Sequence, residues 1–316
     1  MTRLNIPNLE IGSKILIAGA GGGFDVYAGL PLAYSLFTNP APKTFAELEI
    51  VFATFYDKVD ADFLQRPTEQ DDYPLGYYSY NFVETCAGVA HHCYTIGRHG
   101  VQLVRQAYQE IVDKHKIDTI ILVDCGVDIL MRGDEDNYGT ILEDYVSLLA
   151  LGKVFVPNRY VACLGFGCET EEDLNHYRVL ENISNHCRVG DFLGACAMTR
   201  NMKCFDYYKD KCVNAWKDGR KSHTHTRIIP SVTGEFGNYQ MYDDIDARLW
   251  GETVSADKAF VSPLQSIYWW FSLEGVARAN HYREVLEPSR TFVDAKMMLR
   301  NTIPKMGMRS KEVLPL

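Results

Sequence analysis

Residues Thr119–Val123 (Thr-Ile-Ile-Leu-Val) form a short apolar run that constrains the fold more than any other segment. Strands that are apolar on both faces occur in parallel sheets, because helices cover both sides of such a sheet. The run therefore predicts a buried strand of a parallel sheet.

Strand-like and helix-like segments alternate around this run. Further strands are predicted at Ile15–Ala18, Glu47–Phe55 and Arg159–Gly165. Helical spacing or composition predicts helices at Gly100–Lys116, Leu142–Leu151, Glu171–Asn185, Met202–Gly219 and Ser266–His281. Strands joined by helical crossovers predict an α/β fold with a doubly wound, mostly parallel, Rossmann-like sheet.

Two segments interrupt this alternation. Asp57–Gly97 is polar and rich in tyrosine, and it is expected to form a long excursion over one edge of the sheet. The second interruption is the amphipathic segment Met202–Gly219. Because no repeat or linker marks a boundary, we expect a single α/β domain over residues 1–316 with helical insertions near 57–97 and 200–222.

Composition argues against several classes of protein. The formal net charge of −9 disfavours a nucleic acid or an anionic membrane as partner. No apolar run approaches the roughly 20 residues that span a bilayer. Residues Met1–Pro7 also lack the apolar core of a signal peptide. We therefore expect a cytoplasmic protein that binds a small anionic molecule.

The nine cysteines form no metal-binding or disulfide motif. Their number is odd, and no Cys-x-x-Cys pair occurs. Without a secretion signal they are expected to be reduced thiols, mostly buried as small apolar side chains. The aromatic run Tyr268–Phe271 is expected in the core or at an interface between copies of the chain, so a homo-oligomer is a further expectation.

A glycine-rich segment follows the first predicted strand. Gly19, Gly21, Gly22 and Gly23 precede a predicted helix. Glycine permits left-handed backbone conformations and brings backbone N–H groups close to a ligand. The start of a helix adds unpaired N–H groups and the positive end of its dipole. The segment therefore predicts a binding site for a phosphate or a carboxylate.

This segment matches neither common phosphate-binding motif. Phe24 occupies the sixth position of the dinucleotide-binding fingerprint, where glycine is required. Residues Phe37–Lys43 contain no acidic residue to bind a ribose. No Gly-Lys-Ser/Thr follows, which excludes a P-loop. Hydride transfer with a nicotinamide is therefore not expected.

Asp25 stands at the predicted N-cap of the helix after the glycines. A carboxylate there would satisfy the first N–H groups of the helix and repel a bare phosphate. Ligand binding then requires a metal ion between them, or a hydroxyl group facing Asp25. The alternative is a tight strand-to-helix turn that Asp25 caps without any ligand.

An acidic motif begins where the Thr119–Val123 strand ends. Asp124 and Asp128 lie at the edge of the sheet where open α/β proteins bind ligands, and Gly126 stands between them. Oxygen-rich clusters of this kind suit Mg²⁺ shared with substrate phosphates, or supply general acids and bases. The alternative is a solvated acidic loop, although a carboxylate that ends a buried strand requires a partner.

A third segment, Ser222–Gly237, combines two histidines with an arginine. His223 and His225 would share one face of a strand, where they could bind a metal or donate to a phosphate beside Arg227. Gly234 lies in the loop that follows and is a further candidate for ligand binding. The alternative is a polar strand face with ordinary hydrogen bonds.

Two weaker candidates lie near residue 95. A nucleophilic Cys93 beside His92 is disfavoured, because neighbouring side chains on one element point apart. Arg98 precedes a predicted helix and is a candidate contact for an anionic ligand.

The motifs resemble those of DUF1152, a family of unknown function found mainly in archaea and bacteria. The resemblance rests on Gly19–Asp25 with the following Ala28-Gly-Leu-Pro-Leu, on Val123–Glu135, and on the pair Glu143-Asp144. It extends over most of the chain. The resemblance implies a Rossmann-like fold and brings no established activity.

The residues themselves favour an enzyme that acts on a nucleotide-like or phosphorylated small molecule, by transfer or hydrolysis. Gly19, Gly21, Gly22 and Gly23 would hold an anionic group. The carboxylates Asp25, Asp124 and Asp128 would bind Mg²⁺ or a sugar hydroxyl, or act as a base. Asp124 and Asp128 are the predicted metal ligands.

The remaining predicted site residues are His223, His225 and Arg227, which would stabilise developing negative charge. Two alternatives stay open. One is a non-catalytic sensor or oligomeric scaffold that binds a nucleotide or another anion. The other is a zinc-dependent hydrolase that uses His223 and His225.

Overall fold

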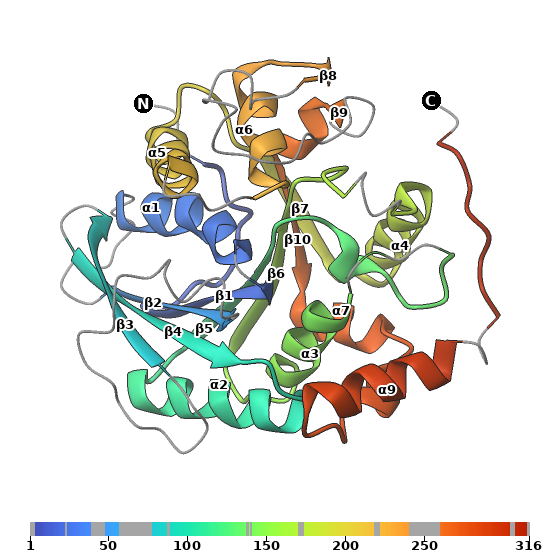
Figure 1. Ribbon diagram of the computed structural model, residues 1–316. Helices are drawn as coiled ribbons and strands as arrows, with labels where there is room; N and C mark the ends of the chain where they lie inside the picture. Colours follow the sequence, from blue (N-terminus) through green and yellow to red (C-terminus); the bar gives the residue numbers. More distant parts are fainter. Residues whose placement is uncertain are drawn as a thin grey trace.

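The computed structural model describes residues 4–22, 24–38, 48–56, 78–86, 89–136, 139, 141–169, 174–217, 222–239, 260–303 and 307–314. These residues form an α/β structure around one large sheet (Figure 1). None of its helices has the length and apolar composition needed to cross a membrane.

The main sheet has eight strands in the order β3-β4-β2-β1-β5-β6-β10-β7. Their bounds are β1 Lys14–Gly22, β2 Glu49–Tyr56, β3 Tyr78–Cys86, β4 Val89–Gly97, β5 Thr119–Asp124, β6 Asn158–Leu164, β7 Phe192–Ala197 and β10 Ile267–Ser272. The central strands from β4 to β6 are parallel to one another, whereas β3 and β10 are antiparallel to their neighbours. A second, two-stranded sheet pairs β8 (Gly237–Asn238) with β9 (Phe260–Val261).

Helices cover both faces of the main sheet, as Figure 1 shows. One face carries α1 (Leu30–Thr38), α5 (Lys203–Lys217) and α6 (His225–Thr233). The other carries α2 (Val101–His115), α3 (Leu142–Leu151), α4 (His176–Val189), α7 (Leu273–Ala279), α8 (Arg283–Leu286) and α9 (Phe292–Thr302). Alternate strand residues enter the two cores, as Ile15 and Leu16 do. The predicted doubly wound α/β fold is confirmed.

The winding of the chain reverses between β1 and β5. From β1 the chain passes to β2 and then β4 on one side, and α2 returns it to β5 on the other side of β1. In open α/β sheets, ligands bind outside the carboxyl ends of the strands at such a reversal. We call the edge where the parallel strands end the carboxyl edge, and the opposite edge the amino edge.

Two predicted helices differ from the observed elements, one in kind and one in where it begins. The expected helix Ser266–His281 is wrong, because Ile267–Ser272 forms β10 and only Leu273–Ala279 is helical. Tyr268 and Trp270 pack on one face of the sheet while Phe271 packs on the other. Bulky aromatic residues favour a pleated strand with both faces buried.

The second difference is the start of α4, which is His176 rather than Glu171. The Asn175 side chain accepts a hydrogen bond from the Arg178 N–H and caps this helix. The acidic residues Glu171–Asp173 lie outside the described residues. The dipole argument for an acidic first turn therefore placed the helix start too early.

The segments predicted as insertions have different positions. Val89–Gly97 is β4 and lies within the main sheet beside β2, whereas residues 57–77 lie outside the described part of the chain. Lys203–Lys217 is α5, which packs against α1. The organisation as a single domain stays a prediction.

Candidate functional site

The glycines after the first apolar run belong to a strand and not to a turn. β1 continues to Gly22, and neither Gly19, Gly21 nor Gly22 has a positive φ. The expected left-handed conformations are therefore wrong for these three, and Gly23 lies outside the described residues. Their conformations do not require glycine, so the reason for glycine must lie in what packs against them.

Carboxylate oxygens lie so close to this strand end that an added side chain would displace them. A Cβ atom on Gly21 would lie 2.8 Å from Asp25 Oδ2 and 2.9 Å from Asp144 Oδ1. On Gly22 it would lie 2.8 Å from Glu143 Oε2 and 3.2 Å from Arg98 Nη2. Glycine leaves room here for acidic side chains, which would have to shift if Gly21 or Gly22 carried a Cβ.

Asp25 does not cap the helix that follows it. The N-cap of the short 3₁₀ helix Asp25–Gly29 is Phe24, and this position makes no side-chain capping bond. The Asp25 carboxylate turns back instead, and its Oδ2 accepts a hydrogen bond of 2.6 Å from the Gly21 N–H. The predicted N-cap role is therefore wrong, and the carboxylate is directed to the carboxyl edge beside β1.

Asp124 and Asp144 complete a group with Asp25. Asp124 is the last residue of β5 and is 2% exposed, and Asp144 extends from the first turn of α3. One carboxylate oxygen from each of the three lies within 4.8 Å of the others. We call Asp25, Asp124 and Asp144 the carboxylate cluster.

The carboxylate cluster has no cationic partner in the described part of the chain. No lysine, arginine or histidine nitrogen there pairs with any of its three members. The buried Oδ2 of Asp124 has no hydrogen-bond partner at all. A buried carboxylate oxygen without a donor is costly, so this position calls for a proton or a cation.

The surroundings raise the pKa of all three carboxyl groups. Desolvation is the largest cause for Asp25, whose pKa rises to about 7 against the opposing effect of the Gly21 N–H. Burial and then the charge of Asp128 raise the pKa of Asp124 and of Asp144 well above the usual value. Protons or a metal ion must therefore compensate the cluster.

Oxygen ligands of this kind fit Mg²⁺ or a similar hard cation. The sequence predicted Asp124 and Asp128 as metal ligands. The structure instead brings Asp124 together with Asp25 and Asp144, while Asp128 stands outside that group and acts on it through its charge. Asp144 was named only with Glu143 in the family resemblance and was not predicted as a site residue.

Glu169, in the loop after β6, lies beside the carboxylate cluster. Its Oε1 accepts a hydrogen bond from the Val127 N–H, and a Cβ on Gly126 would overlap its carboxylate. The Oε2 atom lies 3.8 Å from His176 Nε2, and neither atom has a hydrogen-bond partner. Gly126 thus makes room for Glu169, which the sequence did not single out.

The segment with the two histidines is helical, so the predicted strand is wrong. His225 is the first residue of α6 and is fully buried, whereas His223 precedes the helix and is exposed. The two rings therefore do not share a strand face. Pro230 lies inside the same helix and is buried.

Both ring nitrogens of His225 are engaged. The Tyr208 hydroxyl donates to Nδ1 at 2.5 Å, and Nε2 donates to the Phe24 carbonyl at 2.9 Å. Burial lowers the pKa of His225 to about 4, so the ring is neutral at pH 7. His225 thus anchors the residue before Asp25, and this arrangement leaves neither nitrogen for zinc.

Two further residues that were predicted to bind a ligand make structural contacts in and around α6. Arg227 is buried and donates to the Cys168 carbonyl. Gly234 ends the helix with a φ of 101°, a left-handed conformation that glycine adopts without strain. Neither of these two contacts involves the carboxylate cluster.

The cysteines near the site are thiols. Burial raises the pKa of Cys125 and Cys168 well above the usual value, and that of Cys93 to about 12. Since the thiolate is the nucleophile, these groups are inert at neutral pH.

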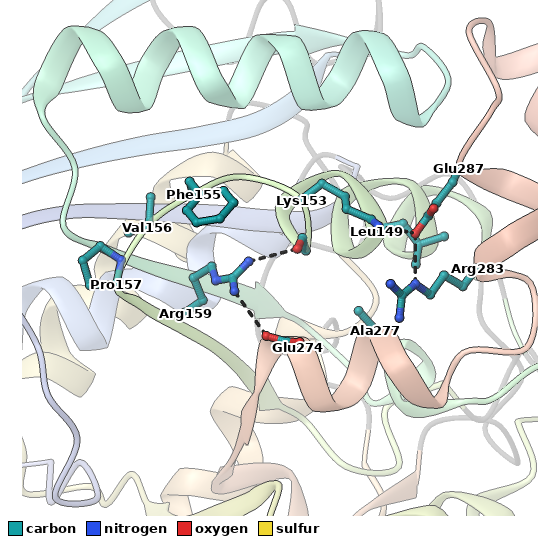
Figure 2. A pocket seen from close by; sticks show the side chains of 11 residues that line it. Leu149, Lys153, Phe155, Val156, Pro157, Arg159, Glu274, Ala277, Arg283 and Glu287 are labelled. Atoms are coloured by element: carbon teal, nitrogen blue, oxygen red, sulfur yellow. Dashed lines mark hydrogen bonds and ion pairs between the residues drawn. The ribbon is translucent and has the colours of Figure 1, made fainter.

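A separate pocket of about 520 Å³ lies at the amino edge, beside the start of β6 (Figure 2). Its charged lining residues pair with one another. Arg159 Nη2 lies 3.4 Å from Glu274 Oε2, and Glu287 Oε1 lies 2.9 Å from Arg283 Nε and 3.4 Å from Lys153 Nζ. Figure 2 shows Arg159 and Arg283 directed to these partners. Each of its three cationic side chains is therefore paired with one of its two carboxylates.

Comparison with known proteins gives a family and no activity. No curated protein and no solved structure matches the chain. A family model described as "Protein of unknown function (DUF1152)" matches residues 77–306. The match covers more than half of the chain and includes Asp124 and Asp144, whereas β1 and Asp25 precede it. The chain therefore belongs to the DUF1152 family.

Proposed function

We propose that this protein is an Mg²⁺-dependent enzyme that acts on a phosphorylated or nucleotide-like small molecule, by transfer or hydrolysis. The observation that carries the proposal is the carboxylate cluster, whose three side chains converge without a cationic partner among the described residues. Asp25, Asp124 and Asp144 would hold the ion. Bound Mg²⁺ supplies positive charge that orients a phosphate and stabilises its developing charge.

The position of the cluster supports a catalytic role. It lies at the carboxyl edge where the winding reverses between β1 and β5, which is the usual place for a ligand in this class of sheet. Mg²⁺ binds through one or two carboxylates and keeps positions for substrate phosphates. The glycines at the end of β1 leave room for the carboxylates beside the backbone.

The residues around the cluster have supporting roles in this proposal. Asp128 and Glu169 add negative charge, which would attract a cation to the cluster. The His225–Phe24 hydrogen bond fixes the backbone that carries Asp25. Neutral His225 therefore positions the cluster and does not transfer protons.

The test measures metal binding and turnover separately. Isothermal titration with Mn²⁺ and Mg²⁺ compares the wild-type protein with Asp124→Asn and Asp144→Asn, and Asp113→Asn on α2 is the matched control. A panel of phosphate esters and nucleotides is then assayed for turnover with Mg²⁺. We expect metal binding that the cluster variants lose and the control keeps, together with Mg²⁺-dependent turnover of a panel member.

Two results would change this proposal. Wild-type protein that binds neither ion would remove its basis. Binding of metal and nucleotide without turnover would instead support the non-catalytic sensor.

A cytoplasmic location and a homo-oligomeric state belong to the same proposal. The described cysteines are all free, as expected in a reducing compartment. Light scattering of the purified protein tests the oligomeric state, and fractionation of cells tests the location.

A further inference from the structure

Arg98 brings a positive charge to the rim of the carboxylate cluster. It directly follows β4, a strand of the parallel group, so its backbone lies at the carboxyl edge. β2 separates β4 from β1 in the sheet. The guanidinium nevertheless reaches the end of β1, where Nη2 would lie 3.2 Å from a Cβ on Gly22.

Glu143 holds the guanidinium in this position. Arg98 Nε lies 2.7 Å from Glu143 Oε1, while Glu143 Oε2 lies on the side of Gly22. Glu143 immediately precedes Asp144 in the first turn of α3. α3 therefore supplies Glu143 to the ion pair and Asp144 to the carboxylate cluster. The two groups lie beside consecutive residues of β1, Gly22 and Gly21 respectively.

Both partners of this ion pair remain open to solvent. The Arg98 side chain is 36% exposed and that of Glu143 is 19% exposed. The other arginine predicted for the site, Arg227, is only 4% exposed and donates to the Cys168 carbonyl. Arg98 thus combines access for a ligand with a position beside the cluster.

We infer that Arg98, oriented by Glu143, binds a phosphate group of the substrate while that group is coordinated to a metal ion at the carboxylate cluster. The inference rests on the proposed function and specifies its substrate class as a phosphate-bearing molecule. A guanidinium matches phosphate oxygens with paired donors, which an ammonium group does not. Glu143 competes with the phosphate for this guanidinium and keeps it oriented when no ligand is bound.

Binding of inorganic phosphate to the Mn²⁺-loaded full chain tests this inference by titration calorimetry. Arg98→Gln is expected to weaken phosphate binding about tenfold to a hundredfold, the usual effect of losing charge-assisted hydrogen bonds. Mn²⁺ binding should change far less. Arg98→Lys should retain part of the affinity, because it keeps the charge and loses the paired geometry.

Two variants separate ligand binding from a structural ion pair. Glu143→Gln removes the competing carboxylate, so phosphate binding should be retained or tightened, opposite to the effect of Arg98→Gln. Arg278→Gln is the matched control, since Arg278 Nη2 lies 2.7 Å from Asp191 Oδ2 before β7, away from the carboxyl edge. It should leave phosphate binding unchanged.

The inference is overturned if Arg98→Gln and Arg98→Lys bind phosphate as tightly as wild-type protein, or if Mn²⁺-loaded wild-type protein binds no phosphate at millimolar concentrations. Equal effects of Arg98→Gln and Glu143→Gln on thermal unfolding, with phosphate affinity unaltered, would show a purely structural ion pair. Absence of Mn²⁺ binding by wild-type protein would instead refute the proposed function, and phosphate titration without metal would then decide the role of Arg98.

Discussion

The two edges of the main sheet differ in whether their charged side chains are paired. At the carboxyl edge, Asp25, Asp124 and Asp144 converge, and no described cation pairs with them. At the amino edge, the pocket of about 520 Å³ carries both signs of charge, and its arginines and lysine pair with Glu274 and Glu287. Both edges lie next to α3, so the difference does not come from separate parts of the fold.

This difference separates a region whose charged side chains are paired from one whose carboxylates have no described counter-charge. Paired and partly exposed charges cost little and contribute little to folding. Buried carboxylates without counter-charge destabilise the folded chain unless protons or cations compensate them. Such a cost is expected at functional sites, where stability is exchanged for binding or catalysis.

Removing one member of the carboxylate cluster should produce the largest effect. Asp124→Asn takes one of three ligands from the cation, and we expect Mn²⁺ affinity to fall about a hundredfold or more. Metal-free stability should be unchanged or slightly higher, because the substitution removes a desolvated carboxyl group. Calorimetric titration and thermal unfolding with and without Mn²⁺ measure both. Unchanged affinity would place the ion elsewhere.

Crowding the cluster should have the next largest effect. In Gly21→Ala the new methyl group meets Asp25 Oδ2 at 2.8 Å and Asp144 Oδ1 at 2.9 Å, so these carboxylates must move apart. We expect about a tenfold loss of Mn²⁺ affinity and a loss of stability of about 1–3 kcal/mol. Gly307→Ala is the control, because a Cβ there meets no atom within 4 Å. Equal behaviour of the two variants would contradict the close packing at β1.

Substitutions at the amino edge should change the stability of the protein and leave its Mn²⁺ affinity unchanged. Arg159 Nη1 donates to the carbonyls of Gly152 at 2.9 Å and Val154 at 3.2 Å, so Arg159→Gln should lower the free energy of unfolding by about 1–2 kcal/mol. Glu274→Gln should change it by less than about 0.5 kcal/mol, because the pair is exposed. Chemical denaturation measures both values. A change in Mn²⁺ affinity in either variant would show that the two edges are coupled.

The pH dependence of stability should give the smallest effect. The raised pKa values of Asp25, Asp124 and Asp144 mean that the folded state holds more protons than the unfolded state above about pH 4. Their contribution to stability is therefore lost as pH rises toward and beyond about 7, the pKa of Asp25.

The histidines have the opposite effect on the pH dependence of stability. The contribution of Asp25 is therefore measured as the difference between wild-type protein and a variant. The lowered pKa values of His186 and His225 make the folded state less stable as pH falls. Thermal unfolding of metal-free wild-type protein is therefore compared with that of Asp25→Asn between pH 6 and 8. Wild-type protein should lose stability relative to the variant as pH rises, and saturating Mn²⁺ should remove this relative loss. A difference that does not vary with pH would contradict the raised pKa of Asp25.

Sequence reasoning succeeded where the signal is local. The helix Leu142–Leu151 has the predicted bounds, and β5 extends only one residue beyond the predicted Thr119–Val123. Apolar runs and helical periodicity record burial directly, so they identify elements before any contact is known. The same reasoning placed Asp124 at the ligand-binding edge, because it directly follows a buried strand.

The wrong predictions of secondary structure have a common origin in contacts between distant segments. Aromatic residues of β10 suited a helix by composition, yet pairing with β6 and β7 made them a strand. The alternation of His223 and His225 suggested a strand, yet burial against Tyr208 and Phe24 made the segment helical. Tertiary packing overrides weak local preferences in such segments.

The sequence by itself determined the α/β class, the parallel sheet and the presence of carboxylates at strand ends, since these follow from apolar periodicity along the chain. Only the tertiary structure decided which carboxylates meet. Asp25, Asp124 and Asp144 converge because β1 and β5 are neighbours in the sheet and α3 begins beside them. Adjacency of strands depends on long-range pairing, which no local pattern encodes. The same pairing turned the glycines of β1 from a predicted phosphate loop into space for a candidate metal centre.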